Sequence, residues 1–145
     1  MHWGWLWFAI LVAWCSVVAT AAQGQTPPPI RHVEVMPQAK HVLDSLAHQA
    51  RTQRVENGAC VVAYVVRDSV LTLEHLERAV YDSADSISIR ARGAICPEGV
   101  PVIHSHVAFD GMPYPSDIDK ATAARRGTWN MLLSVHDSSY FLVVY

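Results

Sequence analysis

Residues 100–119 read VPVIHSHVAFDGMPYPSDID, which predicts a β-strand, a loop and the start of a helix. The strand, expected over Val100 to Val107, carries His104 and His106 two positions apart. Side chains at i and i+2 of a strand leave the same face, so the two imidazoles can reach one metal ion. Asp119, at the start of the helix, supplies a third ligand. Two imidazoles and one carboxylate, with a fourth position left to water, indicate a catalytic zinc site.

Each half of this stretch also has a purely structural interpretation. A His-x-His pair on a strand is common by chance. Ser116 after Pro115 is a good helix N-cap, and Asp119 stands in the acidic position of a capping box. The two halves support each other because one loop joins them, so His104, His106 and Asp119 can meet at a single strand-to-helix corner. We therefore expect Zn²⁺ at that corner.

The 145-residue chain is 51% hydrophobic and 17% charged, which suits one globular domain. Residues 1–22 contain no charged side chain and include an apolar run from Trp5 to Val18, a pattern typical of a signal peptide. A short membrane anchor is the alternative, because the run is marginal for crossing a bilayer. Residues 23–29, with three consecutive prolines, predict an extended linker. The folded domain is then expected over residues 30–145, in an exported (periplasmic or secreted) protein.

The cysteines and the net charge limit the compartment and the partners. Cys60 and Cys96 form an even pair within the folded domain, so they are either a disulfide of an exported protein or two free buried thiols. The formal net charge is −2 and no basic cluster is present. This composition argues against nucleic acid as the main partner.

Hydrophobic patterns predict the remaining elements. Apolar side chains recur with helical spacing between Pro37 and Gln53, which predicts an amphipathic helix. The valine-rich run Ala59 to Val66 predicts a strand in the middle of a sheet, buried on both faces. Ser69–Ala79 fits a strand better than a helical turn. The other expected elements are an edge strand over Ser86–Arg92, a helix over Ser116–Arg126, and a terminal hairpin of strands Thr128–Val135 and Ser139–Tyr145. Together they predict an α/β (α+β) domain with a central, mostly antiparallel sheet flanked by helices.

A hydrolytic metal site also needs a carboxylate that moves protons without being a ligand. Glu56, between the first helix and the valine-rich strand, is the best candidate, although a residue at the end of a helix is by itself more typical of a surface charge. Glu98 is the rival, but the turn Pro97-Glu98-Gly99 is expected to point it to solvent.

These residues resemble the JAMM metalloprotease motif of the MPN domain, over about residues 37–145. The resemblance rests on Glu56 followed by a glycine and a hydrophobic strand, then His104-Ser105-His106, then Pro115-Ser116-Asp117-Ile118-Asp119 at the start of a helix. It implies a single MPN-like domain in which His104, His106 and Asp119 bind zinc. It also implies that Glu56 is the acid/base and that Ser116 binds the water or the oxyanion. The implied function is a zinc-dependent peptidase or isopeptidase that hydrolyses an amide bond in a protein or peptide substrate.

The chain departs from the family pattern between the second histidine and the serine. Nine residues stand there instead of the usual seven, and Val107 replaces the proline that commonly follows the histidines. Phe109, Met112 and Tyr114 in this insertion could form a substrate-binding lip or a subunit contact, or pack on their own domain. The alternative function is a non-catalytic MPN-like module that binds metal or another protein.

Overall fold

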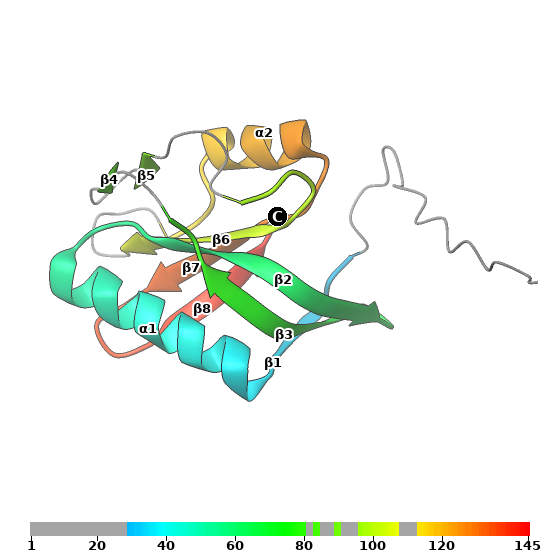
Figure 1. Ribbon diagram of the computed structural model, residues 1–145, viewed down its shortest axis with the longest axis horizontal. Helices are drawn as coiled ribbons and strands as arrows, with labels where there is room; N and C mark the ends of the chain where they lie inside the picture. Colours follow the sequence, from blue (N-terminus) through cyan, green and yellow to red (C-terminus); the bar gives the residue numbers. More distant parts are fainter. Residues whose placement is uncertain (1–28, 81–82, 85–88, 91–95, 108–112) are drawn as a thin grey trace, which may run out of the picture.

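The computed structural model describes residues 29–80, 83–84, 89–90, 96–107 and 113–145. A six-stranded sheet in the order β1-β3-β2-β6-β7-β8 lies between two helices, α1 on one face and α2 on the other (Figure 1). The elements of this layered core are β1 (His32–Val35), α1 (Pro37–Gln53), β2 (Gly58–Arg67), β3 (Val70–Arg78), β6 (Val102–Val107), α2 (Asp117–Arg126), β7 (Met131–Val135) and β8 (Tyr140–Val144). Two short strands, β4 (Ser83–Ala84) and β5 (Ile89–Arg90), pair separately. The predicted mixed α+β class is confirmed, whereas the MPN assignment stays a prediction.

Helix α1 has the predicted bounds, and its apolar stripe builds the core. Pro37 begins the helix, where a missing backbone N–H costs nothing. Arg54 ends it in the left-handed conformation, with its N–H bonded to the carbonyl of Ala50. The side chains that face the sheet are completely buried; they are Ala39, Leu43, Leu46, Ala47 and Ala50. They pack on the inner faces of β3, β6 and β7.

Strands β2 and β3 form a hairpin, which confirms the strand interpretation of residues 69–79. Asp68 and Ser69 in the turn both have positive φ, as a two-residue turn of the type I′ kind requires. The prediction that β2 is buried on both faces is correct only for its first half. Gly58 to Val61 are buried, whereas Val62 to Arg67 are exposed or only partly buried, and β6 pairs only with Gly58–Cys60. Val62 and Val65 are accordingly about half exposed, at 50% and 45%.

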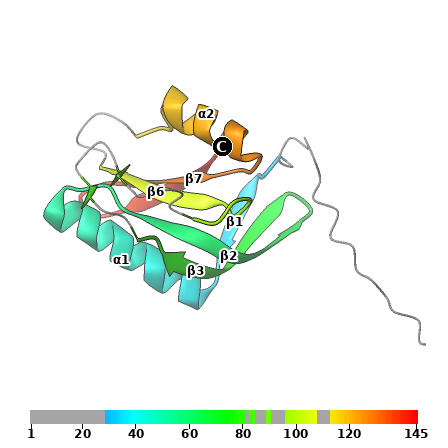
Figure 2. The same cartoon turned by 45° about the horizontal axis from the view of Figure 1, so that its top comes forward.

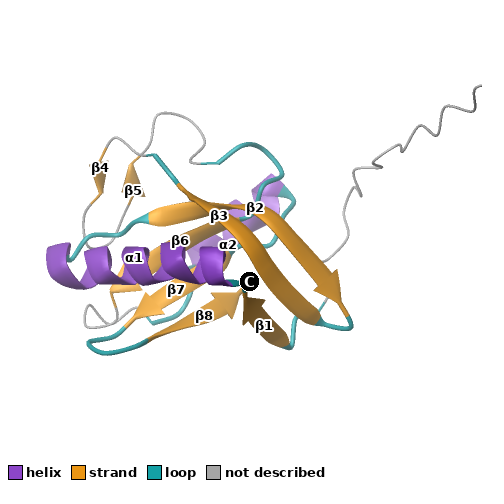
Figure 3. Cartoon of the chain, turned by 60° about the horizontal axis from the view of Figure 1, so that its bottom comes forward, coloured by secondary structure: helices purple, strands orange, loops and turns teal. Residues whose placement is uncertain are grey.

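The sheet is mostly antiparallel, as predicted, but two of its pairings are parallel. Strand β1, which the sequence analysis did not predict, pairs in parallel with β3, and β6 pairs in parallel with β7. The other three pairings are antiparallel, including the predicted terminal hairpin of β7 and β8. The sheet is so strongly curved that its edge strands β1 and β8 face each other across a groove lined by residues 30–33 and 140–144 (Figure 3).

Some sequence-based predictions fall on residues that the structure does not describe. The signal peptide or anchor of residues 1–22, nearly all of the linker, and most of the strand predicted over Ser86–Arg92 lie outside the described ranges. Within those ranges, no helix has the length and apolar character needed to cross a membrane.

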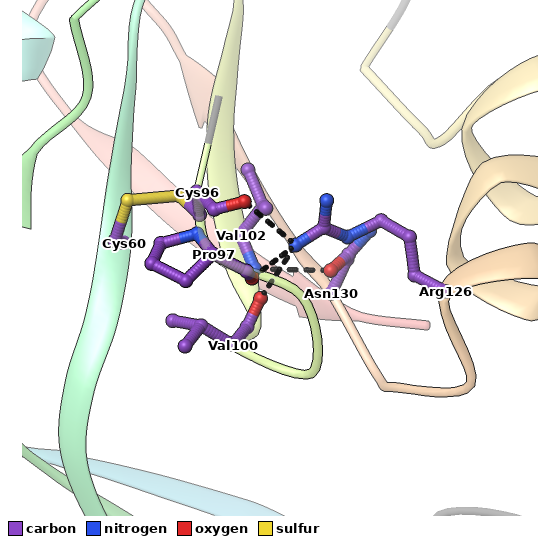
Figure 4. The surroundings of a disulfide bond; sticks show 7 residues. All are labelled: Cys60, Cys96, Pro97, Val100, Val102, Arg126 and Asn130. Carbon is purple, nitrogen blue, oxygen red and sulfur yellow. Dashed lines mark hydrogen bonds between the residues drawn. A yellow bond between two sulfur atoms is a disulfide. The ribbon is translucent and has the colours of Figure 1, made fainter. Parts of the chain in front are cut away.

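Cys60 and Cys96 form a disulfide, so the first of the two alternatives for these cysteines holds. The bond ties β2 to the loop that leads into β6 (Figure 4). Arg126, the last residue of α2, donates to the carbonyl oxygens of Pro97 and Val100 in the same loop at 2.9 and 3.0 Å. The loop before β6 is therefore fastened to β2 by a covalent bond and to α2 by hydrogen bonds.

Candidate metal centre

His104, His106 and Asp119 come together at the corner between β6 and α2, as the sequence predicted. The two histidines leave the same face of β6, and their Nε2 atoms lie 3.2 Å apart. Asp119 is in the first turn of α2, which lies over the outer face of the sheet beside β6 and β7 (Figure 2). Its Oδ1 is 3.4 Å from Nε2 of His104, and its Oδ2 is 3.6 Å from Nε2 of His106. The three side chains form a group that could hold a metal ion.

The spacing of these atoms fits a tetrahedral ion. Ligand bonds of 2.0–2.2 Å that meet at tetrahedral angles place neighbouring ligand atoms about 3.3 to 3.6 Å apart. Nε2 of His104 lies 3.2 Å from Nε2 of His106 and 3.4 Å from Oδ1 of Asp119, both within 0.2 Å of that edge length. The side chains are also shielded from solvent, with 5% of His106 and 13% of His104 exposed. Preorganised, mostly buried N and O donors at this spacing are what a metal site requires.

The capping box of α2 orients the Asp119 carboxylate. Oδ2 of Asp119 accepts hydrogen bonds from the backbone N–H and the hydroxyl of Ser116, at 2.8 and 2.7 Å. In return the Ser116 hydroxyl oxygen accepts from the backbone N–H of Asp119. These bonds occupy Oδ2 and leave Oδ1 turned to His104. The structural and the metal-binding interpretations of residues 116–119 therefore describe one arrangement, in which the cap positions the ligand.

The same contacts set the charge state of the corner. Burial by itself raises the pKa of Asp119, but His104 and the hydrogen bonds from Ser116 outweigh it, so the net pKa lies well below its usual range. Asp119 is therefore ionised at neutral pH, as a metal ligand must be. Tyr145 lies beside the corner, and burial raises the pKa of its phenol, with Asp119 and Glu56 adding negative charge nearby. The Tyr145 phenol therefore stays protonated at neutral pH.

Glu56 also reaches this corner. Its Oε1 lies 3.4 Å from Nε2 of His106, and 6% of its side chain is exposed. It is not part of the group formed by the two histidines and Asp119, so it lies at the edge of that group, beside His106. Glu98, the rival carboxylate, is exposed in a turn. Of these two carboxylates, Glu56 is the one that lies at the corner, and its role as acid/base stays a prediction.

Asn57, which follows Glu56 in the chain, is anchored by buried hydrogen bonds that the sequence analysis missed. The backbone N–H of Asn57 donates to the Ser105 hydroxyl at 2.9 Å, and that hydroxyl donates to the Asn57 side-chain oxygen at 3.0 Å. The Asn57 amide also donates to the carbonyl oxygen of Leu46 in α1. The side chains of Asn57 and Ser105 are completely buried. An asparagine just before a strand expected to be buried could have indicated a buried hydrogen bond. The sequence could not identify its partner, because Ser105 lies 48 positions away.

We expect Asn57→Ala to lower the free energy of unfolding by about 2 to 3 kcal/mol. The buried Ser105 hydroxyl would lose the acceptor of its proton, and the Leu46 carbonyl oxygen would lose the amide donor. Urea denaturation followed by circular dichroism measures this change. Gln53→Ala, at the exposed end of α1, is the matched control and should change stability by less than about 0.5 kcal/mol. Equal stabilities of the two variants would contradict this role for Asn57.

The insertion between the ligands is described only in part. Phe109 and Met112 lie outside the described residues, and Tyr114 is 68% exposed. Ile118, on the outer side of the first turn of α2, is 76% exposed. Two large apolar side chains therefore face solvent close in sequence to Ser116 and Asp119.

The comparisons with known proteins do not assign this chain to a family. No protein-family model matches it, and a search of curated proteins gives no match. Among the solved structures that match is the solution structure of a protein from Salinibacter ruber (strain DSM 13855), a structural genomics target. It is 22% identical in sequence, the match covers 77% of this chain and 79% of that chain, and the TM-score is 0.41. A likeness of this degree carries no functional argument.

Proposed function

We propose that this protein is a zinc-dependent peptidase or isopeptidase of the JAMM type, with His104, His106 and Asp119 as ligands. The observation that carries the proposal is the convergence of two imidazole nitrogens and a carboxylate oxygen at tetrahedral spacing, with a second carboxylate beside them. A neutral histidine has one ring N–H, so two histidines offer two protons to the ring nitrogens and carboxylate oxygens that meet here. A bound cation would interact favourably with the lone pairs of all these nitrogen and oxygen atoms.

The side chains support hydrolysis of an amide bond. Bound zinc supplies Lewis-acid chemistry, lowering the pKa of water from about 15.7 toward about 7. Glu56 would accept the proton of the attacking water and deliver it to the leaving amine. The main role of Ser116 would be to hold Asp119, since the Ser116 hydroxyl donates its proton to that carboxylate. The role of Ser116 at the oxyanion, which the family resemblance implies, would require this hydroxyl to turn toward the substrate.

Export is part of the proposal. The Cys60–Cys96 disulfide supports it, because stable disulfides are typical of oxidising compartments such as the periplasm or the exterior of the cell. Such a protein would meet exported proteins or peptides as substrates. The exposed Tyr114 and Ile118, close in sequence to Ser116 and Asp119, favour substrates with apolar residues next to the scissile bond.

A non-catalytic zinc site is the second candidate. The 3.4 Å between Glu56 Oε1 and His106 Nε2 would also suit a fourth ligand, and a site closed by Glu56 would leave no position for water. The Co²⁺-substituted protein distinguishes the two cases. An exchangeable water detected by pulsed electron paramagnetic resonance would support the catalytic site, and its absence would support the closed one.

We expect the purified protein to bind one equivalent of zinc and to lose amide hydrolysis when a chelator removes it. His106→Ala should lower zinc affinity by at least 100-fold, because it removes one of three protein ligands. His136→Ala, a histidine in the turn between β7 and β8, is the control and should bind zinc like the wild type. Metal analysis after dialysis and a peptide-library assay measure both properties. A protein without stoichiometric zinc would refute the proposal.

A further inference from the structure

Tyr145 lies directly behind one of the candidate ligands. Its hydroxyl oxygen is 3.3 Å from Nδ1 of His104, the ring nitrogen that points away from the metal position. The two rings are perpendicular, with centroids 6.2 Å apart. The opposite nitrogen, Nε2 of His104, faces His106 and Asp119. The phenol and the metal position thus lie at opposite ends of the same imidazole.

This arrangement decides which nitrogen of His104 carries the proton. A neutral imidazole has one N–H, and a nitrogen that binds metal must have none. When Nε2 is the ligand, the proton is on Nδ1 and needs an acceptor, because an unpaired buried N–H costs free energy. The Tyr145 oxygen is within hydrogen-bond distance of that nitrogen. Acceptors behind metal-binding histidines fix the tautomer and the ring orientation.

The position of Tyr145 is itself fixed by Asn130. The backbone groups of these two residues exchange a pair of hydrogen bonds at 2.8 and 2.9 Å, at the point where β7 begins and β8 ends. The buried Asn130 side chain accepts from the backbone N–H of Val102 in β6, a bond drawn in Figure 4. Asn130 therefore ties Tyr145 to β6, the strand that carries His104.

We propose that Tyr145 is a positioning residue of the metal centre: its phenol oxygen accepts the Nδ1 proton of His104 and holds the unprotonated Nε2 toward the metal. This inference rests on the proposed zinc site. It adds a residue that neither the sequence motif nor the ligand group includes. Because Tyr145 acts through His104, it affects metal binding first and catalysis only as a consequence.

The test compares Tyr145→Phe with Tyr140→Phe. Both tyrosines are half-buried near the two ends of β8, and both lose one phenol hydrogen bond, since Tyr140 donates to Asp44 at 2.7 Å, away from the metal centre. Zinc dissociation constants are measured by competition with a chromophoric chelator. We expect Tyr145→Phe to weaken zinc binding by about 10- to 100-fold, and Tyr140→Phe to change it less than twofold. A second measurement, NMR of the zinc-loaded wild type, should detect a His104 Nδ1 proton that is protected from exchange with water.

Each outcome has a defined meaning. Zinc affinity of Tyr145→Phe within twofold of the wild type would overturn the inference, even if its melting temperature fell, because the phenol would then be merely structural. Rapid exchange of the Nδ1 proton in the zinc-loaded wild type would overturn it as well, without any variant. A wild type that binds no zinc would instead refute the proposed function, and this inference with it.

Discussion

Replacing Glu56 by glutamine should lower kcat for amide hydrolysis by about 100- to 10,000-fold while the protein keeps its zinc. Glutamine has nearly the same shape but cannot accept the proton of the attacking water. The side chain lies beside His106 and outside the ligand group, so its loss should not empty the metal site. Steady-state kinetics and metal analysis on the same sample measure the two effects.

Glu98→Gln is the matched control for Glu56→Gln. It removes the same charge from an exposed turn, and its kcat should be within twofold of the wild type. Two results would contradict the role of Glu56: unchanged kcat in Glu56→Gln, or loss of zinc from this variant. The second result would identify Glu56 as a fourth ligand and favour the closed, non-catalytic site.

The sequence predicted the parts of the site that depend on local patterns. His104 and His106 share a face because strand residues alternate, and Ser116 with Asp119 caps a helix because a serine and an acid three positions apart form reciprocal hydrogen bonds. One loop joins these two elements. The three candidate ligands therefore come together when one strand and the first turn of one helix form as predicted.

The missed features depend on contacts between distant segments. Strand β1 has only four residues and pairs with β3 in parallel, and nothing within such a short stretch specifies a partner 38 positions away. The burial of β2 was overestimated because a valine-rich run shows a preference for a strand, but not which of its side chains other elements cover. Asn57 and Tyr145 were missed for the same reason, since their partners Ser105 and His104 lie 48 and 41 positions away.

The disulfide holds the loop that precedes β6, the strand with the two histidines of the candidate metal centre. Cys96 precedes the strand with the two histidines, and Arg126 at the end of α2 binds the carbonyl oxygens of the loop from Cys96 to Val100. Asp119 lies at the other end of the same helix. The placement of both ligand-bearing elements therefore depends on one loop, and the Cys60–Cys96 bond holds that loop to β2.

We expect the double variant Cys60→Ser, Cys96→Ser to lose about 4 kcal/mol of unfolding free energy, the chain-entropy value for a bridge across 36 positions. This is a large part of the 5–15 kcal/mol that stabilises a typical domain. Urea denaturation of the metal-free protein measures it. The reduced wild type should unfold at the same urea concentration as the double variant, and reductant should not change the variant further. Equal stability of the oxidised wild type and the double variant would mean that the hydrogen bonds of Arg126 and the pairing of β6 hold this loop without the covalent bond.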